Sequence, residues 1–441
     1  MNHSAEIKPL IETVIESLNH EGRGVAHING KVVFIHNALP GETVRFRYIK
    51  KHRAHDEAVA EEIITPSADR VMSLCPHYNR CGGCSLQHLS ADAQIAHKQA
   101  MLLEQLKHFG EVVPKEMIPP LTGPITGYRH KARLGVHFTP KKNMLYVGFR
   151  EKNGRYIADI ETCSNLHPSI GQKINTLRDF LFTFEHRETI PQIEVAIGDD
   201  QTALVIRHLE PLSPQEIDQL REFAQRESFE IYLQPKKMDS VYKLWPEDKI
   251  ERLHYALPDH QIDMQFHPCD FTQVNPAINR QMVTQAIEWL KLQSTDTVLD
   301  LFCGLGNFTL AMSRYAKEIV GVEVDELMIA RGQENAKNNQ CNNVNFYAAN
   351  LFEPNTTASW FKKPYNKILL DPPRSGAQEI IQLFPTWPIE KIVYVSCNPA
   401  TFARDAGILV NQQKFKLMKL GMMDMFPHTT HVEVMGLFVR R

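Results

Sequence analysis

Three cysteines, Cys75, Cys81 and Cys84, lie within ten residues, and the last two flank a Gly-Gly turn. Thiols at this spacing can converge on one metal centre, and the fold can bring Cys163 to them as a fourth ligand. The spacing matches neither a ferredoxin cluster nor a zinc ribbon with paired Cys-x2-Cys motifs. We therefore expect a metal site, with both an iron–sulfur cluster and zinc open, and chance clustering of buried cysteines as the alternative.

A glycine-rich turn, Asp300 to Asn307 (DLFCGLGN), closes an expected strand and opens an expected helix. Glycines there let the backbone approach a ligand, and Glu323, at the end of the next strand, is placed to accept hydrogen bonds from ribose hydroxyls. A dinucleotide site would have a third glycine near Thr309, and none is present. The turn therefore suits an adenosine without a pyrophosphate, which favours S-adenosylmethionine over NAD; the alternative is a plain tight turn.

The segment Asp371 to Gly376 (DPPRSG) follows an apolar strand. An acid followed by two prolines gives a stiff turn that holds a carboxylate at the rim of the same sheet. Methylases that act on the amino groups of bases carry an aromatic residue after the prolines, where this chain has Arg374. This difference argues against an exocyclic nitrogen as the target.

Cys397, in the segment SCNP, lies at the end of another strand and just before a helix. The helix dipole at this place can lower the pKa of the thiol and produce a nucleophilic thiolate, whereas a buried, inert cysteine is the alternative. His428, His431 and Glu433 enter the last strand, where Glu433 could act as a general base near Cys397. From the residues alone, a solvated acid at a strand edge is the interpretation that we prefer for Glu433.

The elements that must position these residues change along the chain. Strands alternate with helices from about residue 275 to the end, a pattern that predicts a mostly parallel, doubly wound sheet with ligands at the carboxyl ends of its strands. The first 65 or so residues read as short strands of a small β-barrel, with five basic residues between Arg45 and Arg53. These basic residues suit either a phosphate backbone or a solvated edge strand.

The middle of the chain reads as an amphipathic helix over 90–110 and then as alternating strands of an antiparallel domain up to about residue 260. Arg129, Lys131 and Arg133 alternate along one face of the strand expected at 127–138, which predicts a basic outer face.

The composition fits a globular chain of several domains: 441 residues, 43% hydrophobic and 23% charged, with a net charge of −2. No apolar run approaches the length of a membrane helix, and the first residues lack the pattern of a signal peptide, so we expect a cytoplasmic protein without a membrane partner. Eight cysteines in such a chain argue against a disulfide framework. We expect Cys269, Cys303 and Cys341 to be buried structural thiols.

Taken together, GRGVAH, ALPGE, the CGGC run, DLFCGLGNFTL, DPPRSG, SCNPATFARD and HTTHVE resemble the bacterial RNA uracil-5-methyltransferases. The resemblance covers nearly the whole chain. It implies a multidomain fold: a TRAM β-barrel that binds RNA over 1–67, an α+β middle domain with an iron–sulfur cluster over 68–262, and a Rossmann-like methyltransferase domain over 263–441. A TRAM barrel, which the member of the family acting on transfer RNA lacks, points to ribosomal RNA.

The resemblance also implies residue roles. Cys397 matches the nucleophile and Glu433 the base, and the residues matching a 4Fe-4S cluster are Cys75, Cys81, Cys84 and Cys163. The residues matching the S-adenosylmethionine site are Gln273, Phe302, Asn307, Glu323, Asn350 and Asp371, of which Gln273 and Asp371 also lie near the target base. The implied reaction adds Cys397 to carbon 6 of a uridine, methylates carbon 5, and ends when Glu433 removes the proton from carbon 5.

The expected function is therefore methylation of a uridine in 23S ribosomal RNA by a protein that is expected to be a monomer. Two alternatives stay open: the same chemistry on another 23S uridine or on transfer RNA, and an iron–sulfur RNA-binding protein that has lost catalysis. An intact Cys397 and Glu433 argue against the second.

Overall fold

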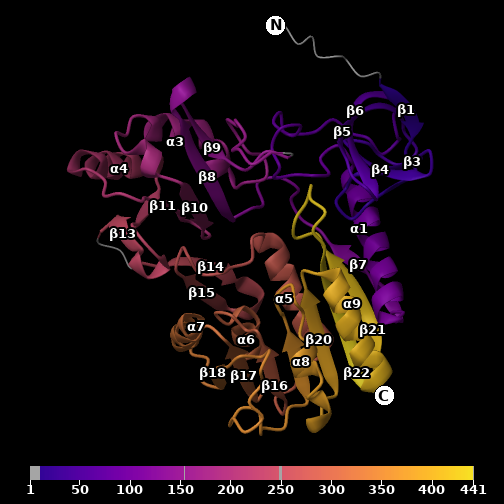
Figure 1. Cartoon of the computed structure of the whole chain (residues 1–441). Coiled ribbons are helices and arrows are strands. Elements are labelled where there is room, and N and C mark those ends of the chain that lie inside the picture. Colours follow the sequence, from indigo (N-terminus) through magenta and orange to yellow (C-terminus); the bar gives the residue numbers. More distant parts are fainter. Residues whose placement is uncertain (1–9, 153, 248–250, 441) are drawn as a thin grey trace, which may run out of the picture.

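The computed structural model describes residues 10–152, 154–247 and 251–440, whose strands form four sheets (Figure 1). Residues 1–9 of the expected barrel and residue 441 of the expected C-terminal domain lie outside the described residues. Among the described residues, no helix has both the length and the apolar character needed to cross a membrane.

The N-terminal sheet has six short strands in the order β1-β5-β6-β4-β3-β2. Alternating burial along β4 and β5 encloses a small core that contains Val33, Ile35, Val44 and Phe46. The expected strands are all present, with these bounds: β1(Ile11–Val14), β2(Ser17–Leu18), β3(Gly24–Ile28), β4(Lys31–His36), β5(Thr43–Lys51) and β6(His55–Thr65).

The helix expected over 90–110 is α1(Ala91–Gln105) with one further π-helical turn to Gly110. The Ser90 side chain caps its start by accepting a hydrogen bond from the Ala93 amide. The helix lies beside α9(Pro399–Gly407), at the right of Figure 1. Their backbones meet at Gly110 and Gly407, since a Cβ on Gly110 would lie 2.4 Å from the Ala403 carbonyl oxygen. Two glycines thus let a helix of the middle region dock onto the C-terminal layer.

The middle sheet is mixed, whereas the sequence predicted an antiparallel one. Its order is β13-β12-β11-β10-β8-β9, and β11 and β12 are parallel. The correction arises because α4(Pro214–Glu227) carries the chain back between these two strands. The bounds are β8(Lys131–Thr139), β9(Met144–Gly148), β10(Gln192–Ile197), β11(Thr202–Arg207), β12(Glu230–Gln234) and β13(Tyr242–Trp245), with α2(Pro168–Gly171) and α3(Ile174–Phe182) between β9 and β10.

The hairpin of β14(Leu253–Leu257) and β15(Ile262–Phe266) joins the middle region to the C-terminal one. The domain boundary expected after residue 262 falls inside β15, so the chain passes from one region to the other within a strand. The division into 1–67, 68–262 and 263–441 otherwise stays a prediction.

The C-terminal sheet has eight strands in the order β18-β17-β16-β19-β20-β22-β21-β7. The first five are parallel, β22 is antiparallel to both neighbours, and β7(Glu116–Leu121) runs parallel to β21 at the edge. The sequence did not predict β7. The remaining strands are β16(Thr297–Leu301), β17(Glu318–Glu323), β18(Val344–Ala348), β19(Lys367–Leu370), β20(Lys391–Ser396), β21(Phe415–Met423) and β22(Glu433–Arg440).

Helices cover both faces of this sheet, as expected for a doubly wound fold. Val298 of β16 packs into a core shared with α5, and Leu299 packs into the core on the other face with α1 and α9. The further helices are α5(Pro276–Leu290), α6(Asn307–Met312), α7(Glu326–Asn338) and α8(Gln378–Ile381). The carboxyl ends of β16, β17, β19 and β20 therefore meet at one rim.

Candidate functional site

A cavity of about 680 Å³ opens at this rim. It collects every residue to which the sequence assigned a catalytic or methyl-donor role. These residues are Gln273, Phe302, Asn307, Glu323, Asn350, Asp371, Cys397 and Glu433.

The glycine-rich turn after β16 takes a conformation that only a few residue types adopt easily. Gly304 and Gly306 have φ values of +54° and +96°, and Phe302 has +64°. The amides of Phe302 and Cys303 both donate to the carbonyl oxygen of Val322 on the neighbouring strand. The turn is thereby tied to β17, and it brings backbone to the cavity wall just before α6 begins.

Glu323, the last residue of β17, is held by backbone amides. One carboxylate oxygen accepts from Gly304 at 3.2 Å, and the other accepts from Val324 at 2.7 Å and Asp325 at 3.2 Å. These bonds fix the carboxylate at the cavity between the two strand ends. A fixed acceptor at this place is the arrangement that ribose hydroxyls need.

Asn307, at the start of α6, is fixed by two partners. Its amide group exchanges hydrogen bonds with Asn279 at 2.9 and 3.0 Å, and its side-chain oxygen also accepts from the Tyr255 hydroxyl at 2.9 Å. Tyr255 comes from β14 and also lines the cavity. Sequence reasoning missed it, because only the fold brings a residue of this hairpin to the rim.

The cavity wall is strongly aromatic. The rings of Phe302 and Phe352 lie 5.9 Å apart, and Phe308 and Phe426 also line the wall. Phe271, two residues before Gln273, is 72% exposed at the cavity. Flat apolar walls of this kind bind planar heterocycles such as purine or pyrimidine rings.

Cys397 and Glu433 come from neighbouring antiparallel strands. The last paired residues of β20 and β22 are Ser396 and Val434, so the same register sets Cys397 opposite Glu433. Glu433 is 8% exposed and Cys397 is half-buried. The interpretation preferred from the residues alone, a solvated acid at a strand edge, is therefore wrong, because Glu433 is buried and lines the same cavity as Cys397.

Three acidic groups share this part of the cavity. Burial raises the pKa of Glu433 to about 8 and that of Asp371 to about 7. Burial and the two carboxylates also raise the pKa of the Cys397 thiol to about 11. The expectation that the helix dipole lowers this pKa is therefore wrong for the protein without ligands, because desolvation and negative charge outweigh the dipole.

Arg374 is the one guanidinium or ammonium group among the described residues that line the cavity. It opposes the rise in the pKa of both Cys397 and Glu433. Its carbonyl oxygen accepts hydrogen bonds from the Asn398 amide group at 2.9 Å and the Thr401 hydroxyl at 3.2 Å. The DPPR turn is thus bound to the loop that carries Cys397, a role for Arg374 that the sequence did not reveal.

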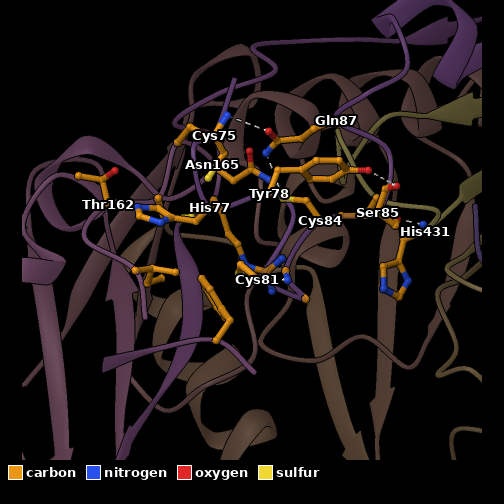
Figure 2. Close-up of a pocket in the computed structure, with 18 of the residues that line it drawn as sticks. Cys75, His77, Tyr78, Cys81, Cys84, Ser85, Gln87, Thr162, Asn165 and His431 are labelled. Carbon is orange, nitrogen blue, oxygen red and sulfur yellow. Dashed lines mark hydrogen bonds between the residues drawn. The ribbon is translucent and has the colours of Figure 1, made fainter. Parts of the chain in front are cut away.

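A second cavity, of about 380 Å³, is lined by Cys75, Cys81, Cys84 and Cys163 (Figure 2). All four are free thiols. The chain thus brings the three clustered cysteines and the distant fourth to one place, as the metal hypothesis requires.

The surroundings of the sulfurs suit thiolate ligands. Cys84 accepts from the side-chain amides of Gln87 at 3.3 Å and Asn165 at 3.2 Å, and Cys81 accepts from the Gly83 amide at 3.4 Å. Burial raises the pKa of Cys81 to about 11 and of Cys84 to about 12. Thiols with such a pKa become thiolates at neutral pH only beside a compensating cation, which a metal centre provides.

The spread of the sulfurs bears on the kind of metal. Within the described ranges, no three of these cysteines have sulfurs that all lie within 4.8 Å of one another. A single zinc with Zn–S bonds of about 2.3 Å would place its sulfurs roughly 3.8 Å apart. Every set of three therefore includes at least one pair of sulfurs farther apart than the ligands of a single zinc ion.

The expected basic faces are partly neutralised. On the barrel, Arg45 pairs with Glu12 and Glu62, and Arg47 pairs with Glu61. Lys50, Lys51 and Arg53 form no ion pair with another described residue, and the Lys51 ammonium lies over the Tyr48 ring at 4.7 Å from its centroid.

The basic face expected on the middle strand is not a single free surface. Arg133 pairs with Glu194, while the ammonium of Lys131 donates to the carbonyl oxygens of Pro268 and Asp270. Arg129 lies before β8 and lines the cysteine cavity. The three side chains therefore serve different contacts.

Comparison with known proteins agrees with this architecture. Residues 90–441 match the model of the tRNA (Uracil-5-)-methyltransferase family, and residues 11–50 match the TRAM domain. The crystal structure of Pyrococcus abyssi tRNA (uracil-54, C5)-methyltransferase in complex with S-adenosyl-L-homocysteine has the same fold, with a TM-score of 0.74 at 24% identity over 97% of this chain and 100% of that one.

Relatives of higher identity share nearly the full length. The 23S rRNA (uracil(1939)-C(5))-methyltransferase RlmD of Hahella chejuensis is 50% identical and covers 96% of both chains. The protein of the same name from Francisella tularensis subsp. novicida is 48% identical over 99% of this chain and 98% of its own. The resemblance seen in the sequence is confirmed, and the chain belongs to the tRNA (uracil-5-)-methyltransferase family.

Proposed function

We propose that this enzyme transfers a methyl group from S-adenosylmethionine to carbon 5 of a uridine in 23S ribosomal RNA, the uridine 1939 named for its relatives. The opposed pair Cys397 and Glu433, in one cavity with the expected methyl-donor residues, is the observation that carries the proposal. Relatives at 48 to 50% identity over nearly the whole chain support this substrate.

The cavity fits S-adenosylmethionine, which supplies the methyl group when bound. Glu323 would accept hydrogen bonds from the ribose hydroxyls, and the rings of Phe302 and Phe352 would enclose the adenine. Asn307, held by Tyr255 and Asn279, presents a fixed amide beside the glycine-rich turn. We assign Asn350, Asp371 and Gln273 to the same site, because they complete the wall between it and Cys397.

Cys397 is the nucleophile in this proposal. Carbon 5 of uracil is a weak nucleophile, and addition of a thiolate to carbon 6 converts the ring to an enolate whose carbon 5 can take a methyl group. The thiol must first lose its proton, for which we assign Asp371 as the acceptor because its pKa near 7 leaves it partly ionised at neutral pH. Arg374 stabilises the thiolate.

Glu433 completes the reaction. After methyl transfer, carbon 5 still carries its proton, and the Glu433 carboxylate would remove it so that the bond between Cys397 and carbon 6 breaks and the thiolate leaves. With a pKa near 8, about a tenth of the Glu433 carboxyl groups are ionised at pH 7, and the ionised form is a stronger base than an ordinary carboxylate.

Gln273 is our candidate for recognition of the uracil edge, since its amide can donate to the ring oxygen on which charge develops. The cavity lies at the carboxyl ends of the strands, so the uridine must be single-stranded or flipped out of its stack to reach Cys397.

We propose a 4Fe-4S cluster at the four cysteines. The spread of the sulfurs supports it, and so do the amide donors to Cys81 and Cys84. A bound cluster supplies a covalent cross-link. Its ligands would tie the loop of residues 75–84 to the segment around Cys163 on the middle domain.

Modification of ribosomal RNA would place the protein in the cytoplasm, and the monomeric state stays a prediction. The test compares cells with and without the gene, by mapping 5-methyluridine in their ribosomal and transfer RNA. We expect loss of the modification at one 23S position. Loss confined to transfer RNA would favour the alternative substrate, and no loss in either would refute the proposal.

A further inference from the structure

The segment Asp424 to His431 links β21 to β22 and leads directly into Glu433. Met423 and Glu433 are paired across the two strands, so the segment forms the loop of this hairpin. Asp424, Met425, His428 and Thr429 are all buried. A buried loop needs partners for its backbone polar groups from other parts of the protein.

The loop that carries the cysteines supplies two of these partners. The amides of Ser85 and Leu86, just after Cys84, donate to the carbonyl oxygen of His428 at 3.0 and 2.9 Å. The amide of His428 donates to the side-chain oxygen of Gln94 on α1 at 2.8 Å. The buried Lys98 of the same helix donates to the Asp424 carboxylate at 2.7 Å. The segment 424–431 is therefore fixed by the cysteine loop and by α1.

His431 lies where the two cavities meet, because it lines both of them. Figure 2 shows it at the side of the cysteine cavity where Ser85 lies. Its Nδ1 is 3.3 Å from the guanidinium of Arg374. An arginine can only donate, so Nδ1 must accept. Partial desolvation at the cavity wall and the positive charges of Arg374, Arg129 and Lys98 lower the pKa of His431, although the residue as a whole is exposed to solvent. The lowered pKa favours the neutral ring that an acceptor needs.

We propose that His431 is a positioning residue for methyl transfer: it holds the Arg374 guanidinium beside Cys397 and Glu433, and the cysteine loop fixes His431 through the segment 424–431. The inference rests on the proposed function of Cys397. The cysteine loop would then contribute to catalysis indirectly, because it helps to fix the position of the Arg374 guanidinium in the other cavity.

The effect on Cys397 follows from the charges around it. Asp371 and Glu433 raise the pKa of the thiol, and Arg374 is the cation that lowers it. Among the described residues, His431 is the hydrogen-bond partner of the Arg374 guanidinium, whereas Asn398 and Thr401 hold only its carbonyl oxygen. Loss of the His431 acceptor would free the guanidinium, weaken its interaction with the thiolate, and raise the pKa of Cys397.

The first test uses His431→Leu, which removes the acceptor, and His431→Asn, whose side-chain oxygen lies close to the position of Nδ1. Both holoenzymes are mixed with RNA containing 5-fluorouridine and S-adenosylmethionine, and the rate of covalent adduct formation is followed against pH. We expect the profile of His431→Leu to move to higher pH, and adduct formation at neutral pH to be roughly tenfold slower if the profile moves by about one pH unit. The pH profile of His431→Asn should stay close to that of the unmutated enzyme.

His108→Leu is the matched control, since His108 is exposed and lines neither cavity. Metal content and affinity for S-adenosylhomocysteine are measured for each variant and should be unchanged, which separates positioning from misfolding. An unshifted profile for His431→Leu, or equal damage in His431→Leu and His431→Asn, would overturn the role of His431. If the unmutated enzyme forms no adduct, the proposed function fails as well.

The second test concerns the link to the cysteine loop, which Gln94 of α1 helps to form: its side-chain amide donates to the carbonyl oxygens of Leu86 at 3.1 Å and Leu89 at 2.8 Å. Gln94→Leu removes the acceptor of the His428 amide, whereas Gln94→Glu retains one. If Gln94 acts through His431, the change in the pH profile caused by Gln94→Leu should be smaller in a His431→Leu background than in the unmutated one, because the two changes act on the same guanidinium. Fully additive effects, or an unchanged profile in Gln94→Leu, would show that the segment does not transmit this constraint.

Discussion

Cys397 and Glu433 face each other at the point where the pairing of β20 with β22 ends, in the register that sets Ser396 opposite Val434. Two antiparallel strands thus deliver a thiol and a carboxylate to one cavity, although the residues are far apart in sequence. Because each follows directly from a paired strand position, the distance between them is set by the sheet itself. Nucleophile and base can therefore be tested by separate substitutions.

Cys397→Ala should abolish methylation and leave the affinity for S-adenosylhomocysteine nearly unchanged, because other residues form the donor site. Binding is measured by calorimetry, and methylation by transfer of a labelled methyl group to RNA. Cys341→Ala, at a buried cysteine outside both cavities, is the control and should remain active. Residual methylation by Cys397→Ala would assign the nucleophile elsewhere.

Glu433→Gln should allow addition and methylation but block elimination, because an amide cannot take the proton from carbon 5. A methylated RNA bound to Cys397 should accumulate and run as a slow band on a denaturing gel. Normal turnover by this variant would show that another acid is the base, and Asp371 would be the first to examine.

The raised pKa of Glu433 also predicts a dependence of stability on pH. In the folded protein without ligands, the carboxyl binds its proton up to about pH 8, against an ordinary value of 4.5. The folded state therefore holds more protons than the unfolded state between these values, and stability falls as pH rises through this window. Glu433→Gln should remove that loss and be more stable than the unmutated protein above pH 8, by up to a few kcal/mol at about 1.4 kcal/mol per pKa unit. Thermal unfolding of both proteins at pH 6 and pH 9 measures this gain in stability. An equal difference in stability between the two proteins at both pH values would contradict the prediction.

The cysteine site predicts a coloured protein. Anaerobically purified protein should be brown with about four iron atoms per chain, and Cys84→Ser should lose most of the colour and iron. A colourless protein with one zinc and no sulfide would refute the cluster. Affinity for S-adenosylhomocysteine should survive the loss of iron, since the donor residues lie in the other cavity.

Salt dependence of RNA binding separates the two kinds of basic residue on the barrel. Replacing Lys50, Lys51 and Arg53 by alanine should reduce the slope of log affinity against log salt, because these side chains have no carboxylate partner in the described part of the chain. The matched variant with Arg45 and Arg47 replaced should reduce the slope less, since these side chains are paired with glutamates. Equal slopes in both variants and the unmutated enzyme would assign all this charge to solubility.

The site was more predictable than the connections between its parts. Cys397, Asp371 and Glu323 each stand at the end of an apolar strand, and the ends of parallel strands meet at one rim, so local patterns sufficed. Tyr255 and His431 come to the cavity only through long-range packing, which leaves no periodic signal. The same holds for the parallel pairing of β11 with β12, which depends on the return of the chain through α4.

β7 shows a further reason why part of the fold was not predicted from the sequence. Its sequence, EMIPPL, contains two adjacent prolines, and these usually mark a loop because proline cannot donate to a neighbouring strand. The strand lies at the edge of the sheet and pairs on one side only, with β21. An edge strand can therefore accommodate the two prolines, which lack a backbone N–H group. An edge position cannot be read from the segment itself.

The position of β7 also constrains how the protein is made. Domains usually fold as units while the chain is still being synthesised, the N-terminal ones first. Residues 116–121 leave the ribosome early, yet their partner strand β21 begins only at Phe415. The C-terminal sheet therefore cannot close its edge during translation, and the last step of folding must wait for almost the entire polypeptide. A fragment that starts at residue 263 would expose the edge of β21 and tend to aggregate, so the C-terminal region should fold well only with the chain that precedes it.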